Sequence, residues 1–138
     1  MASQKVIEAL NRARARELGV VLQYMWQHAT AQGLASPPVA GLFKDIAKVE
    51  MKHAESLAER VAYLGGEPTT QPDPVKKSAD LKQMIQDDLD LENQAIKMYK
   101  ETIQLCRQED DPTSRVLMED LLADEEEHAH EFGNLLGK

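Results

Sequence analysis

A glutamate and a histidine interrupt an apolar helical face in the segment IAKVEMKHAESLAERVAYL, residues 46–64. At helical spacing this face runs from Ile46 to Leu57, and the two inward positions between them hold Glu50 and His53. Residues three apart lie one turn from each other on the same side of a helix, so this carboxylate and imidazole can bind one metal ion. The pair is the first candidate for chemistry in the chain.

The same pattern occurs in both halves of the chain, at the constant offset that carries Glu17 onto Glu92. In each half a single glutamate precedes a Glu-x-x-His sequence, and the spacing between them is the same. We call these six residues the Glu/His cluster: Glu17, Glu50, His53, Glu92, Glu125 and His128. A further Glu-x-x-His at Glu127 does not fit, because Gln94 stands where its preceding glutamate would have to be. Several polar matches in one register indicate a functional repeat.

Four carboxylates and two imidazoles on the inward faces of four helices would meet midway along a bundle. Unpaired buried carboxylates repel one another and lose hydration, which is costly. Two divalent cations would balance the four negative charges, and two glutamates with two Glu-x-x-His pairs form the dinuclear carboxylate arrangement of four-helix bundles. The oxygen-rich donor set favours iron or manganese over zinc or copper.

A buried network of ion pairs is the alternative interpretation of the cluster. It requires lysine or arginine on the interior faces beside the glutamates. The helical faces assign no basic residue to this region, apart from Arg14 or Arg60 toward the ends. We therefore expect metal ions at the cluster.

Proline and glycine divide the chain into the elements that must position these residues. We expect helices over about 3–32, 37–64, 78–108 and 112–136, with Ser3 as the first cap and Ser78 or Asp80 near the start of the third helix. The sequence EPTTQPDP between the second and third helices cannot be helical. Short, long and short links predict an all-α, antiparallel four-helix bundle with a long crossover between helices two and three, in a single domain over residues 1–138.

Composition limits the partners of this domain. The net charge is −8 with no basic block, which argues against nucleic acid as a partner. The single cysteine, Cys106, excludes an internal disulfide and any multi-cysteine metal site. No leader segment opens the chain and no apolar run approaches the length of a membrane-spanning helix, so we expect no membrane partner and a cytoplasmic location.

The segments RELGVVLQYMWQHA, VEMKHAESLAERVAYLGGEP, DLDLENQAI and LLADEEEHAHEF resemble the bacterioferritins over nearly the whole chain. This resemblance implies a ferritin-like fold and a ferroxidase centre of two iron ions. Glu50 and Glu125 would bridge the ions. The terminal ligands would be Glu17 with His53 on one iron, and Glu92 with His128 on the other.

The same resemblance implies a haem site and an assembly. Met51, in EMKHA, would be the axial ligand of a haem b shared between two subunits; its alternative is an apolar residue that packs a dimer interface. The chain ends soon after His128, so we expect a short form without the fifth helix of bacterioferritins. Asp45 and Val49 stand where many bacterioferritins have His and Asp on the inner surface. We expect a homo-oligomer of at least two copies; the sequence leaves open whether a storage cage forms.

Three other residues near the cluster have two interpretations each. Tyr24 and Tyr99 follow Glu17 and Glu92 two turns along the same face. Each tyrosine either supports the metal site, through a hydrogen bond to a ligand carboxylate or as a source of an electron, or is an aromatic residue of the core. Asp88, one turn before Glu92, either orients a ligand histidine or is an exposed acid at the edge of the helix, which is the commoner case.

The leading functional hypothesis is oxidation of Fe(II) with O2 or peroxide, linked to iron storage or detoxification. One alternative is a rubrerythrin-like peroxidase, which would need an outside electron donor because no Cys-x-x-Cys is present. Another is a non-catalytic haem- or metal-binding dimer. The sequence does not name the redox partner.

Overall fold

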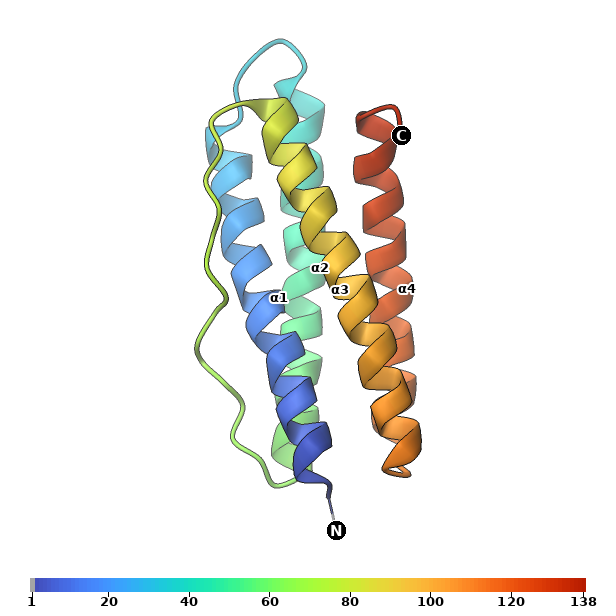
Figure 1. Ribbon diagram of the computed structural model, residues 1–138. Helices are drawn as coiled ribbons and strands as arrows, with labels where there is room; N and C mark the ends of the chain where they lie inside the picture. The colour runs from blue at the N-terminus through green and yellow to red at the C-terminus, as the bar shows by residue number, and fades with distance from the viewer. Residues whose placement is uncertain (1) are drawn as a thin grey trace.

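Four long helices make up the computed structural model, which describes residues 2–138. They are α1 (Gln4–Thr30), α2 (Ser36–Tyr63), α3 (Leu81–Gln108) and α4 (Pro112–Leu135), and the described residues contain no strand. The helices α1 and α2 run in opposite directions, as do α3 and α4, whereas the long crossover lets α3 run in the same direction as α2 (Figure 1). This confirms the all-α four-helix bundle with a long crossover.

Polar caps set where three of the helices begin. The side chains of Ser3, Asp80 and Asp111 accept hydrogen bonds from backbone N–H groups in the first turns of α1, α3 and α4. The expected start of the third helix at Ser78 is too early, because Asp80 is the cap and the Ser78 hydroxyl donates to Asp87 (2.5 Å). The other predicted boundaries lie close to the observed ones.

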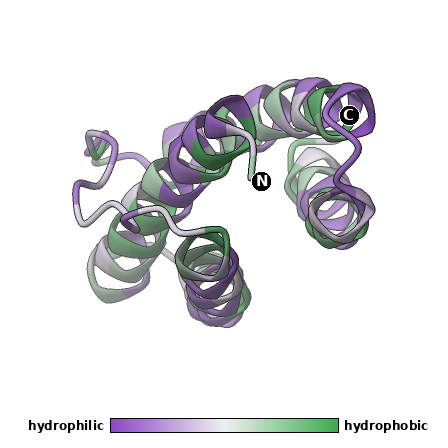
Figure 2. Ribbon diagram, turned by 90° about the horizontal axis from the view of Figure 1, so that it is seen from below, coloured by the Kyte–Doolittle hydropathy of each residue, from purple (hydrophilic) through white to green (hydrophobic). Residues whose placement is uncertain are grey.

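The crossover between α2 and α3 follows the outside of α1 along most of its length (Figures 1 and 2). The backbone N–H of Asp73 donates to the carbonyl of Ala15 (2.9 Å), and that of Lys76 donates to the side chain of Gln23 (2.8 Å). The approach at Gly19 is so close that a Cβ there would lie 2.8 Å from the carbonyl oxygen of Asp73. These contacts fix a segment that has no secondary structure of its own.

Two apolar clusters fill the interior, one toward each end of the bundle. One contains Leu57, Cys106 and Met118, and the other contains Phe43 and Phe132. The helices pack mainly as two pairs, α1 with α2 and α3 with α4. The Glu/His cluster lies between the two apolar clusters, where all four helices contribute side chains. None of the helices within residues 2–138 has a stretch long and apolar enough to span a membrane.

Candidate metal centre

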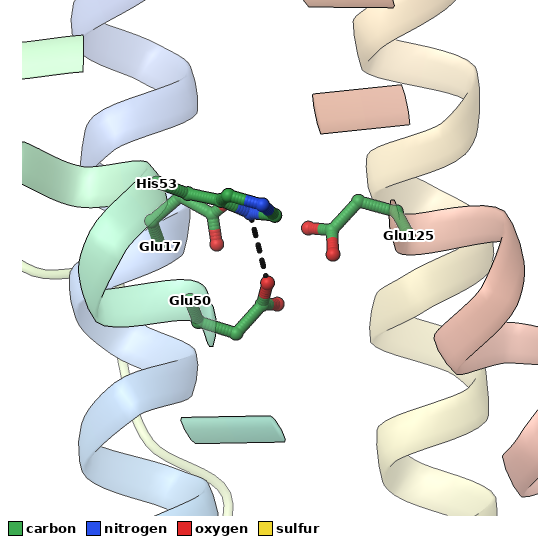
Figure 3. Close-up of side chains that lie close together, drawn as sticks. All are labelled: Glu17, Glu50, His53 and Glu125. Carbon is green, nitrogen blue, oxygen red and sulfur yellow. Dashed lines mark hydrogen bonds and ion pairs between the residues drawn. The ribbon is translucent and has the colours of Figure 1, made fainter. Parts of the chain in front are cut away.

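All six residues of the Glu/His cluster meet in the middle of the bundle, and all six are buried. Figure 3 shows four of them, with Glu17, Glu50 and His53 directed from α1 and α2 toward Glu125 of α4. Their donor atoms form two groups, and within each group these atoms lie within 4.8 Å of one another. The groups are Glu17, Glu50, His53 and Glu125, and Glu50, Glu92, Glu125 and His128. Glu50 and Glu125 belong to both groups, as bridging ligands must.

The two histidines point the same ring nitrogen at the cluster. His53 Nδ1 lies 3.0 Å from Glu17 Oε1 and 3.1 Å from Glu50 Oε1. His128 Nδ1 lies 3.0 Å from Glu125 Oε1 and 3.2 Å from Glu92 Oε1. The sequence repeat is therefore also a repeat in space.

The other ring nitrogen of His53 contacts Asp124, a residue that the sequence reasoning missed. His53 Nε2 lies 2.7 Å from Asp124 Oδ2. A carboxylate at this position fixes the ring orientation and tautomer of a metal-binding histidine. The position equivalent to Asp124 in the first half is Val49. This mismatch of an acid with an apolar residue was the sequence feature that could have drawn attention to Asp124.

Arg16 lies among the four glutamates, which corrects the expectation that no basic residue stands beside them. Its Nη1 lies 3.0 Å from Glu17 Oε2 and 2.8 Å from Glu50 Oε2, and it also contacts Glu125 Oε2. Its Nη2 lies 2.5 Å from Glu92 Oε2. Arg16 is only 4% exposed. Its Cα–Cβ direction differs from that of Glu17 by about 100°, and its long stem carries the guanidinium back into the interior.

The two basic residues considered from the sequence lie elsewhere. Arg14 donates to the carbonyls of Thr69 and Ala54, so it anchors the crossover and α2 to α1. Arg60 pairs with Asp111 (2.9 Å) at the end of the bundle. Neither contacts the Glu/His cluster.

The buried carboxylates differ in their affinity for protons. Burial raises the pKa of Glu50 well above its ordinary value, and the neighbouring carboxylates raise it further. Burial also raises the pKa of Glu17, to about 7, with a contribution from the charge of Glu125. At Glu125 burial acts in the same direction, but the charge of Arg16, hydrogen bonds from His128 and Glu50, and the charge of His53 together outweigh it and lower the pKa to about 2.

Burial lowers the pKa of both histidines, but their carboxylate partners outweigh it. The hydrogen bond to Glu17 contributes most to raising the pKa of His53, to about 9, and that to Glu125 to raising the pKa of His128, to about 10. Metal ions bind neutral imidazole. A cation that binds here must therefore replace protons on both rings.

The two tyrosines have different environments. The hydroxyl of Tyr99 donates to Glu17 Oε1 (2.9 Å), as expected for a phenol that holds a ligand carboxylate. The hydroxyl of Tyr24 is buried and has no hydrogen-bond partner within residues 2–138, and its ring packs edge-on against Phe132. The proposed contact between Tyr24 and a glutamate is thus not present, and Tyr24 has the packing of a core aromatic.

Asp88 is fully buried, so the interpretation as an exposed acid is wrong. Its Oδ1 accepts hydrogen bonds from Gln23 Nε2 (3.0 Å) and Gln27 Nε2 (2.8 Å). These two glutamines are on α1, so Asp88 joins α3 to α1 and contacts neither histidine of the cluster. Burial raises its pKa from 3.8 to about 8.

Met51 lies on the outside of α2 and is 57% exposed. Its side chain is therefore accessible to another molecule. Its role as a haem ligand stays a prediction.

The donor set fits two divalent cations. Four carboxylates and two imidazoles form two overlapping four-donor groups, and the buried Glu50 Oε1 has only ion-pair contacts with the Nδ1 atoms of His53 and His128 and makes no well-aligned hydrogen bond in residues 2–138. Two divalent cations and the Arg16 guanidinium together would bring five positive charges to four carboxylates, so metal and Arg16 compete for the same negative charge.

The chain matches the family model of the ferritin-like domain over residues 7–138. It is 37% identical over 132 residues to the bacterioferritin of Desulfovibrio desulfuricans, a match that covers 95% of this chain and 74% of that protein. The bacterioferritin of Brucella melitensis is 34% identical over 125 residues, with 90% and 78% covered.

Solved structures give the same result. The X-ray structure of the D. desulfuricans bacterioferritin, described with its diiron site in different catalytic states, has a TM-score of 0.90 at 37% identity and covers 95% of this chain and 77% of that chain. A ferritin-like, diiron-carboxylate protein of Bacillus anthracis has a TM-score of 0.93 at 32% identity, with 96% of each chain covered. The chain therefore belongs to the ferritin-like family and is homologous to the bacterioferritins.

Proposed function

We propose that this protein is a di-iron ferroxidase that oxidises Fe(II) with O2 or peroxide, in the service of iron storage or detoxification. The observation that carries the proposal is the pair of four-donor groups that share Glu50 and Glu125. The homology to bacterioferritins supports iron as the metal, whereas the donor set alone would also accept manganese.

Each residue of the cluster has a distinct task in this proposal. Glu17 with His53, and Glu92 with His128, would hold one ion each, and Glu50 and Glu125 would contribute to both ion positions. Bound iron supplies the electrons that reduce the oxidant. The four glutamates come from four different helices, so the bundle fixes their spacing and needs little rearrangement during turnover.

Contacts around the ligands orient them for this task. Asp124 holds the ring of His53 so that Nδ1 faces the centre, and Tyr99 donates to Glu17 Oε1. Burial of all four glutamates keeps bulk water from their oxygens. The carboxylates then balance positive charge at the centre most effectively, because electrostatic interactions are strongest where the dielectric constant is low.

The test is stopped-flow absorbance after aerobic addition of Fe(II). We expect Glu50→Ala to slow oxidation by at least about tenfold relative to the unchanged protein. Glu127→Ala is the matched control, because Glu127 is exposed and lies in the Glu-x-x-His sequence that does not complete the repeat. Equal rates in the unchanged protein and Glu50→Ala would contradict the proposal. Peroxide reduction without accumulation of ferric iron would instead favour the peroxidase alternative.

A further inference from the structure

Arg16 takes up the same side of all four glutamates. Its contacts go to the Oε2 atom of each carboxylate, whereas the Oε1 atoms of the glutamates face the two histidines. One guanidinium thus sits where four buried carboxylates converge, and it is the only Lys or Arg side chain in residues 2–138 that contacts them. It supplies positive charge that the cluster lacks without metal.

The fit between this guanidinium and its partners is poor. An arginine side chain matches a carboxylate best as a two-pronged fork, with two parallel N–H bonds to one partner. Here Nη1, which has two hydrogens, faces three carboxylate oxygens, and Nε is buried without a hydrogen-bond partner in residues 2–138. The carboxylates are therefore spaced for a compact cation and not for an arginine.

A guanidinium and two divalent cations draw on the same four carboxylates for balancing charge. Two divalent cations alone balance four negative charges, so a guanidinium that stayed 2.8 Å from Glu50 Oε2 would leave one excess positive charge in this buried centre. Like charges a few ångströms apart in a buried site repel strongly. Metal binding is therefore expected to displace Arg16 from the carboxylates.

We propose that Arg16 is an internal counter-cation that competes with metal ions for the four glutamates. It stabilises the metal-free protein and withdraws its guanidinium when the two ions bind. Arg16 thereby sets how tightly the centre holds metal and prevents mutual repulsion of the glutamates before loading. This inference rests on the metal site of the proposed function.

The sequence repeat supports a specific role for this residue. The position equivalent to Arg16 in the second half is Leu91, so only one half of the bundle provides such a cation. Arg16 Nη2 lies 3.4 Å from the carbonyl oxygen of Leu91, which places the head of the side chain between α1 and α3. The single guanidinium of Arg16, from the first half of the chain, therefore contacts glutamates of both halves.

The experiment is calorimetric titration of the metal-free protein with Mn²⁺, which needs no turnover. The variants are Arg16→Gln, which removes the charge, and Arg16→Lys, which keeps it. Arg14→Gln is the matched control, because Arg14 lies on the same helix and contacts only backbone carbonyls. Thermal unfolding is recorded for each protein with chelator and with saturating Mn²⁺.

We expect Arg16→Gln to bind Mn²⁺ at least about tenfold more tightly than the unchanged protein, and to unfold at a lower temperature when metal-free. Arg16→Lys should lie between the two, and Arg14→Gln should keep the affinity of the unchanged protein. Equal or weaker Mn²⁺ binding by Arg16→Gln would overturn the competition. If Arg16→Gln binds Mn²⁺ and the unchanged protein does not, the proposal that metal ions displace the Arg16 guanidinium would be overturned.

Absence of the metal site gives a different result, since then neither the unchanged protein nor Arg16→Gln binds Mn²⁺. A protein that binds Mn²⁺ but does not oxidise Fe(II) would contradict the proposed function and leave the competition by Arg16 intact. If Arg16→Gln does not fold, the side chain can be followed in the unchanged protein by the ¹⁵N resonance of Arg16 Nε, without and with Zn²⁺. We expect a clear shift or loss of this signal upon loading. An unchanged resonance at saturating Zn²⁺ would overturn the proposal.

Discussion

Two charged side chains outside the Glu/His cluster contact its donor atoms. Arg16 contacts the Oε2 atoms of the glutamates, and Asp124 contacts the outer nitrogen of His53. Neither residue lies on an inward helical face predicted from the sequence. Arg16 contacts the centre because its side chain is long, and Asp124 contacts His53 because it lies beside that ring. The chemistry of the site thus depends on residues next to its ligands in sequence as well as on the ligands.

Asp124→Asn tests the role of this acid at the residue scale. We expect one of the two Mn²⁺ binding events to weaken by about 10–100-fold, because the ring of His53 loses the carboxylate that orients it. The second event should change little, since His128 has Val49 and not an acid at the equivalent position. The measurement is calorimetric titration.

Asp45→Asn is the control, because Asp45 is exposed and lines the same surface pocket as Asp124 without contacting His53. An equal loss in both variants would show that general surface charge, and not the hydrogen bond to His53, sets the affinity.

At the scale of elements, the crossover and α1 behave as one unit. The crossover has no secondary structure, and its conformation depends on hydrogen bonds to α1 and on close approach at Gly19. Asp88 adds a buried polar link between α1 and α3 through Gln23 and Gln27. The helix that carries Arg16 and Glu17 is therefore held on two sides.

Gly19→Ala should destabilise the protein by about 1–3 kcal/mol, because the new Cβ would lie 2.8 Å from the carbonyl oxygen of Asp73. Gly41→Ala is the matched control within α2, where a Cβ meets nothing within 4 Å. That change should stabilise the helix by up to about 1 kcal/mol. Urea unfolding of the metal-free proteins measures both. Equal effects of the two substitutions would mean that the crossover moves away from residue 19 at little cost in free energy.

At the scale of the whole molecule, the two halves of the chain build one centre with approximate twofold character. The Glu/His cluster follows the repeat, and the departures from it lie at Arg16 opposite Leu91 and at Asp124 opposite Val49. The two ion positions should therefore differ in affinity although their ligands have the same types. Outside the centre, Leu22 and Met25 of α1 and Met51 of α2 are exposed apolar side chains.

Met51→Leu separates the two interpretations of this exposed residue. If two copies of Met51 hold a haem, the haem absorption band of the reconstituted protein should disappear in the variant while its mass in solution stays the same. Met25→Leu is the control, since it changes an exposed methionine of the neighbouring helix. An unchanged haem band in Met51→Leu would leave packing of an interface as its role.

The sequence by itself determined the four helices, the long crossover and the meeting of six donor residues at one level of the bundle. Those features follow from the helical period, from proline and glycine, and from an internal repeat with a constant offset, all of which are local or periodic properties of the chain. The third helix was expected to start at Ser78 or Asp80 because both residues are good caps. The structure distinguishes them, because Asp80 accepts a hydrogen bond from the backbone N–H of Gln83 while Ser78 donates to Asp87.

Only the tertiary structure decided the contacts of the long and polar side chains. Arg16 turns inward because of the negative electrostatic potential of four glutamates. These glutamates come from four different helices, so the pattern of one helix does not reveal their combined charge. The same holds for Tyr99 and Tyr24, which are equivalent in the repeat but differ in hydrogen bonding, and for Asp88, which is buried by glutamines of another helix. Helical periodicity fixes the direction in which a side chain leaves its helix, whereas its final partner depends on charges that the fold brings together from distant parts of the sequence.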